Sequence, residues 1–88
     1  MTRSPRYAAE AHCIAGDAYL VLHRIAEART SYQTALTIDP TSPEALCGLG
    51  RCAQNFGLFE VAENYYRLCV DSAPGHYAVH FADSALER

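Results

Sequence analysis

The fold is decided by the stretch between two prolines, residues 40–74, which reads PTSPEALCGLGRCAQNFGLFEVAENYYRLCVDSAP. Pro40 and Pro74 are 34 residues apart, and the same offset relates residues of this stretch to residues upstream of it. The identical pairs are Glu10 with Glu44, Ala11 with Ala45, Cys13 with Cys47, Gly16 with Gly50, Ala28 with Ala62, and Tyr32 with Tyr66. Small and aromatic residues that recur together at one period of about 20–50 residues indicate a repeat architecture.

Each period reads as helix, turn, helix, turn. The turn inside the first period is predicted at His23 and Arg24, and its counterpart is at Gly57, which can take the positive φ of a helix end. The first period ends at Asp39 and Pro40, because proline cannot continue the helical hydrogen-bond ladder. The predicted helices cover about residues 7–22, 25–38, 43–56, 58–72 and 76–87.

The second repeat opens with a helix N-terminal signal. Ser42 is the predicted N-cap, Pro43 the first helical residue, and Glu44 favours the positive end of the helix. Inside the helices, Gly16 and Gly50 are predicted to let neighbouring helices approach closely. A glycine in a helix interior costs about 1 kcal/mol relative to alanine, so two at one register indicate compensating packing.

Composition limits the possible functions. The chain has 88 residues, enough for one domain, and half of them are apolar. All seven basic residues are arginines scattered along the sequence, and the net charge is −3, so binding to nucleic acid is not expected. No secretory signal and no run of about 18 apolar residues is present, which predicts a cytoplasmic protein that does not insert into a membrane.

The four cysteines lie in apolar helical stretches, and none forms a Cys-x-x-Cys motif. Buried free thiols in a reducing cytosol are therefore the favoured interpretation of Cys13, Cys47, Cys52 and Cys69, with disulfides as the alternative. Cys13 and Cys47 share a register and could approach each other across neighbouring helices.

The spacing of these residues closely resembles the tetratricopeptide-repeat (TPR) signature. The first repeat carries it at Gly16, Tyr19, Ala28, Tyr32, Ala35 and Pro40, and the second at Leu49, Gly50, Gly57, Ala62, Tyr66 and Pro74. The departures are His12 and Leu46 where the family often has Trp, His23 at the turn glycine, and Ala53 at an aromatic position. Asp83 and Ser84 depart from the pattern again in the last helix.

This resemblance implies an all-α, right-handed helical solenoid of five antiparallel helices in a single domain. Repeat one would cover about residues 9–42, repeat two residues 43–76, and a capping helix about residues 77–88. It also implies a scaffold that binds a peptide or partner segment in a concave groove, rather than an enzyme.

By register, the resemblance places a set of residues on that groove. They are Glu10, Cys13, Ile14, Asp17 and Leu20 from the first repeat, Glu44, Cys47, Arg51 and Gln54 from the second, and Phe81 from the last helix, with Val21, Gly48, Ala78, Ala82 and Ala85 nearby. Such a mixed surface suits a peptide with apolar anchors. The alternative is that these side chains form an ordinary solvent-exposed surface that binds no ligand.

Three further hypotheses concern the kind of partner. The clamp with which some TPR domains capture a C-terminal carboxylate is not expected, because Cys13, Asp17, Gly48, Ala78 and Ala82 stand at its positions. The stretch 48–52 together with residues 77–80 resembles TPR-like chaperones of type III secretion. A structural, self-assembling element is the other alternative, with a possible homodimer through the apolar face of the C-terminal helix.

No arrangement in the sequence predicts catalysis, a metal or a cofactor. His76 and His80 could share a helix face, but no third ligand lies near them. Asp17 and Glu44 would lie in an open groove, which lacks the dry surroundings that separate the pKa values of paired carboxylates.

Overall fold

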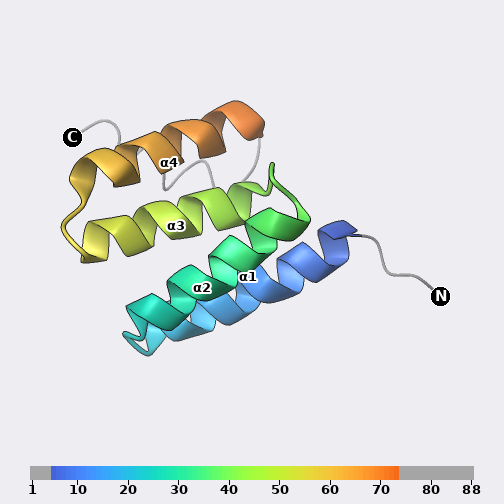
Figure 1. Ribbon diagram of the computed structural model, residues 1–88, viewed down its shortest axis with the longest axis horizontal. Coiled ribbons are helices and arrows are strands. Elements are labelled where there is room, and N and C mark those ends of the chain that lie inside the picture. The colour runs from blue at the N-terminus through green and yellow to red at the C-terminus, as the bar shows by residue number, and fades with distance from the viewer. Residues whose placement is uncertain (1–4, 74–88) are drawn as a thin grey trace.

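The computed structural model describes residues 5–73, and this range contains four helices (Figure 1). They are α1 (Pro5–Val21), α2 (Ile25–Ile38), α3 (Pro43–Asn55) and α4 (Phe59–Ser72). Each boundary lies within two residues of its predicted position. The predicted fifth helix, with its capping role, lies outside the described residues.

The helices form two antiparallel pairs, α1 with α2 and α3 with α4 (Figure 1). Helix α3 lies at the centre, because it contacts α4 and also both helices of the first pair. The backbone of α4 lies next to that of α3 only, among the described helices. The all-helical class is therefore confirmed over the described range, whereas the right-handed solenoid of five helices stays a prediction.

The turns inside the two pairs have the same geometry. His23 and Gly57 both adopt positive φ, at 59° and 77°. The next residue donates its backbone N–H five residues back: Arg24 to Tyr19 at 2.9 Å, and Leu58 to Ala53 at 2.9 Å. This is the Schellman pattern, which favours glycine at the left-handed position. His23 takes this position in the first turn as predicted, although it carries a Cβ.

The link between the pairs is held by short side chains. The Asp39 carboxylate accepts hydrogen bonds from the Thr41 backbone N–H at 3.2 Å and the Thr41 hydroxyl at 3.0 Å. Ser42 then caps α3 by accepting a hydrogen bond from the Ala45 backbone N–H at 3.3 Å, with Pro43 as the first helical residue. The predicted N-cap at Ser42 and the helix start at Pro43 are confirmed.

The core combines small residues, buried leucines and two tyrosines. Ala28, Tyr32 and Ala35 from α2 are fully buried, and Ala62 and Tyr66 from α4 are nearly so. The Tyr32 ring lies against the backbone at both Gly16 of α1 and Gly48 of α3, and the Tyr66 ring lies against Gly50. The buried residues form two clusters, one shared by α1, α2 and α3 and the other by α3 and α4; Leu36 and Tyr65 pack against both clusters, so the core is continuous. Gly48, expected near the groove, is instead a buried helix contact.

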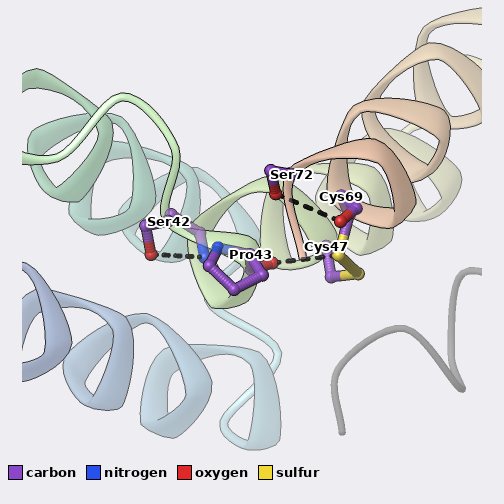
Figure 2. Close-up of a disulfide and its surroundings, with 6 residues drawn as sticks. Ser42, Pro43, Cys47, Cys69 and Ser72 are labelled. Carbon is purple, nitrogen blue, oxygen red and sulfur yellow. Dashed lines mark hydrogen bonds between the residues drawn. A yellow bond between two sulfur atoms is a disulfide. The ribbon is translucent and has the colours of Figure 1, made fainter. Parts of the chain in front are cut away.

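One prediction about the cysteines is wrong. Cys47 and Cys69 form a disulfide between α3 and α4, with Cα atoms 5.7 Å apart (Figure 2). Cys13 and Cys52 are buried free thiols, as expected. The bridge joins residues that are 22 apart in sequence, across the two helices of one repeat. The shared register of Cys13 and Cys47 does not identify the bonded pair. That register relates equivalent positions in two successive repeats, whereas the disulfide joins two helices of the same repeat.

Candidate functional site

Helices α1 and α3 contact each other and carry nine of the ten predicted groove residues. Six of these side chains are exposed or half-exposed: Glu10, Ile14 and Asp17 on α1, and Glu44, Arg51 and Gln54 on α3. We call these six residues the α1/α3 face. Cys13, Leu20 and Cys47 are buried beneath it and pack in the core. Phe81 lies outside the described residues.

The α1/α3 face is acidic around one apolar side chain. Ile14 is 69% exposed, and Glu10 and Asp17 lie one helical turn to either side of it on α1. The pKa of the buried Cys13 thiol reflects these charges. Burial raises this pKa to about 11, and a hydrogen bond with the Ser42 hydroxyl opposes the rise. The carboxylates of Glu44, Asp17 and Glu10 raise the pKa further. Carboxylates of both helices thus converge on one region.

Two of the polar residues are fixed in place by buried tyrosines. The Tyr32 hydroxyl donates a hydrogen bond to the Asp17 carboxylate. The Tyr66 hydroxyl donates one to Gln54 Oε1 at 2.6 Å. Burial, followed by the hydrogen bond to Asp17, raises the pKa of Tyr32, so this phenol stays protonated as a donor. From the sequence these tyrosines are recognised only as members of the repeat signature, and their recurrence at one register is the available sign of a role at the site.

A polar cavity of about 250 Å³ opens at one end of this face. It lies between the start of α3, the end of α4 and α1, and Figure 2 shows Ser42 and Pro43 across from Ser72. Its lining is rich in carboxylates and hydroxyls: Glu10, Asp39, Thr41, Ser42, Pro43, Glu44, Ser72 and Ala73. A cavity with this lining has the chemistry to receive a cationic or hydrogen-bond-donating group. Sequence reasoning found Glu10 and Glu44 but missed the wall from α4.

A second groove, apolar and about 170 Å³ in volume, lies between α2 and α4, and residues of α3 also line it. It is lined by Arg29, Gln33, Leu49, Cys52, Ala53, Phe56, Leu58, Val61 and Tyr65. The sequence analysis did not identify this groove, although Phe56, Leu58 and Val61 are exposed apolar residues close together in sequence.

No metal site is built into residues 5–73, where no three His, Cys, Asp or Glu side chains come together in a way that could hold an ion. None of the helices described in that range has the length and apolar character needed to cross a bilayer. His76 and His80, considered above as ligands, lie outside the described residues.

Comparison with known families agrees with the repeat seen in sequence and structure. A model of the TPR repeat matches residues 16–51, and a model of the tetratricopeptide repeat matches residues 43–76. No curated protein matches the chain. The second match begins at Pro43, the first residue of α3, and thus spans the whole second helix pair. Together the two matches show that the chain belongs to the tetratricopeptide-repeat family.

Proposed function

We propose that the α1/α3 face binds a peptide segment of a partner protein that presents basic side chains beside an apolar one. TPR repeats are in general non-catalytic modules for protein–protein interaction, which supports a binding role over an enzymatic one. The observation that carries the finer proposal is the exposed Ile14 between the carboxylates of Glu10 and Asp17, of which Glu10 also lines the polar cavity.

The charge pattern selects the kind of peptide. The carboxylates of Glu10, Asp17 and Glu44 all raise the pKa of the Cys13 thiol beneath the face. Arg51 is the one basic residue among the six residues of the α1/α3 face. A lysine or arginine of the partner would gain from this field, whereas an acidic peptide would be repelled. The apolar anchor beside it would cover Ile14 and remove its side chain from water.

A partner that binds through its C-terminal carboxylate fits this face poorly. Asp17 would repel it, and Cys13 and Gly48 are buried at the positions where donors would be needed. The other two positions of that clamp, Ala78 and Ala82, lie outside the described residues. An internal segment of the partner is thus a better fit than its C-terminus.

Three finer expectations remain proposals that rest on the sequence. They are a cytoplasmic location, a chaperone role like that of type III secretion chaperones, and a homodimer through residues 77–88. Sedimentation over a range of concentrations tests the dimer directly: a monomer at every concentration would contradict it.

Binding is tested with peptides selected from a random display library and labelled for fluorescence anisotropy. We expect the selected peptides to be basic, with an apolar residue. Ile14→Ser removes the apolar side chain without changing the charge of the face, and it should weaken their binding at least about tenfold. The matched control is Leu68→Ser, which makes the same kind of change at an exposed leucine of α4 and should leave affinity unaltered. Equal losses in both variants, or selection of acidic peptides, would contradict the proposal.

A further inference from the structure

The disulfide occupies a position that the first repeat fills without one. Cys47 corresponds to Cys13 and Cys69 to Ala35 at the 34-residue offset. Ala35 and Cys13 are both buried in the first pair, where Cys13 is a free thiol. In the first pair, the equivalent positions on α1 and α2 are filled by the Cys13 thiol and the Ala35 methyl group. Packing of the two helices at these positions therefore does not require a covalent bond.

The reduced form of the second repeat has a hydrogen-bond acceptor in place. Cys69 Sγ lies 3.2 Å from the backbone carbonyl oxygen of Pro43, as the dashed line in Figure 2 marks. A disulfide sulfur carries no proton, so this contact becomes a hydrogen bond only when Cys69 is a thiol. Reduction would leave Cys69 buried but satisfied, which avoids the cost of an unpaired polar group.

The bridge also joins α3 to α4, the described helix with the fewest backbone contacts to other described helices. The backbone of α4 lies next to that of α3 alone among the described helices, and the buried side chains of α4 are Ala62, Tyr66 and Cys69. Cys69 is in the last turn of α4, and its carbonyl accepts a hydrogen bond from the Ser72 hydroxyl at 3.1 Å. Ser72 and Ala73 form one wall of the polar cavity, so the bridge fixes that wall against the start of α3.

From these three observations we infer that Cys47 and Cys69 are a reversible redox modification site that locks the end of α4 onto α3. The co-reactant is a small thiol of the glutathione class. Its thiolate attacks one sulfur of the bridge to form a mixed disulfide and release a cysteine thiolate, which takes up a proton. A second thiol then resolves the mixed disulfide, so that two electrons pass to the protein and the small thiol leaves as its disulfide.

Access sets the condition for this exchange. Cys47 is 3% exposed and Cys69 is fully buried, so a small thiol reaches the sulfur only when α4 opens locally. The bridge suppresses that opening in the oxidised protein, and reduction makes it more frequent. The first pair has no such bond, and its opening should not depend on redox state.

The test is hydrogen–deuterium exchange of the intact chain in oxidised and reduced glutathione buffers, with free thiols counted by maleimide labelling after denaturation. We expect the oxidised chain to show two free thiols, Cys13 and Cys52, and the reduced chain four. Amides of α4 should exchange at least about tenfold faster after reduction, while amides of α1 and α2 change less than about twofold. No ligand is present, so the outcome is independent of the proposed peptide binding.

Two variants make the result specific. Cys69→Ala reproduces the cysteine–alanine pair of the first repeat, and its α4 should exchange at the reduced rate in both buffers. Cys52→Ala removes a buried thiol outside the bridge and should keep the full response. Equal exchange of α4 in both buffers, or a uniform increase over all helices of the wild-type chain, would overturn the inference. These wild-type outcomes decide it even if Cys69→Ala does not fold.

Discussion

Gly50 and Tyr66 fit together as backbone against ring: a Cβ built on Gly50 would lie 2.7 Å from Cε1 of Tyr66. The first repeat shows the same relationship, with 2.7 Å between a Cβ on Gly16 and Cε1 of Tyr32. Real Cβ atoms do not approach other atoms this closely, so each glycine is required by the ring opposite. The tyrosine hydroxyl in turn reaches a polar residue of the α1/α3 face, which connects the core to the candidate site.

The first prediction is that Gly50→Ala destabilises the protein, although alanine is the better helix former by about 1 kcal/mol. The Tyr66 ring is buried and its hydroxyl is bonded to Gln54, so it cannot withdraw freely from the added methyl group. Overpacking of this kind costs about 1–3 kcal/mol, which leaves a net loss of up to about 2 kcal/mol in the free energy of unfolding by urea.

Asn64→Ala is the control for this measurement, because Asn64 is exposed on α4 and its smaller gain in helix propensity meets no ring there. It should leave the urea midpoint unchanged or slightly raised. A Gly50→Ala protein as stable as the control would show that the ring and the backbone are not in contact.

The second prediction concerns the helix crossing at Ala62, which is 2% exposed. Ala62→Leu adds three carbons where α4 meets α3, and we expect a loss of about 1–3 kcal/mol by denaturation. Val61→Leu enlarges the exposed neighbour and should change stability by less than about 0.5 kcal/mol. A normal midpoint for Ala62→Leu would contradict the register of the second repeat.

The repeat register, the turns and the small residues of the core could be predicted from the sequence because each has a local physical cause. Pro40 and Pro43 set helix boundaries through the backbone, and Ser42 does so through its own hydroxyl. His23 is an example of how the repeat position determines backbone geometry. It adopts positive φ like Gly57, its counterpart in the second repeat, although it is not a glycine.

The disulfide and the cavity could not be predicted from the same pattern. Cys47 meets Cys69 because α3 and α4 lie close together at that point, a distance that no sequence period encodes. Cys13 and Leu20 fit the spacing of a surface stripe, yet the neighbouring helices bury them. The α4 wall of the cavity, at Ser72 and Ala73, depends in the same way on how the second pair is placed against α1.

The third prediction is a loss of stability at alkaline pH. Burial raises the pKa of both free thiols, Cys13 and Cys52, from 9.0 to about 11. The unfolded chain therefore loses these protons first, and the stability that the neutral thiols contribute is full below about pH 9 and is lost as the pH rises through about 11. The raised pKa of Tyr32 extends the loss above this window.

Urea midpoints at about pH 8 and about pH 11 measure this effect. A variant with Cys13→Ala and Cys52→Ala should lose less stability between the two values than the wild-type protein. Identical pH dependence in both proteins would show that the buried thiols do not titrate with shifted pKa values.

The central claim, that α1 and α3 present the binding surface, is tested most directly by NMR. Backbone amide shifts of the labelled protein are followed while a basic peptide selected from the display library is added. The account predicts shift changes that centre on Ile14 and Asp17 of α1 and on Glu44 and Arg51 of α3. Changes confined to the groove between α2 and α4, with the α1/α3 face unaltered, would contradict it.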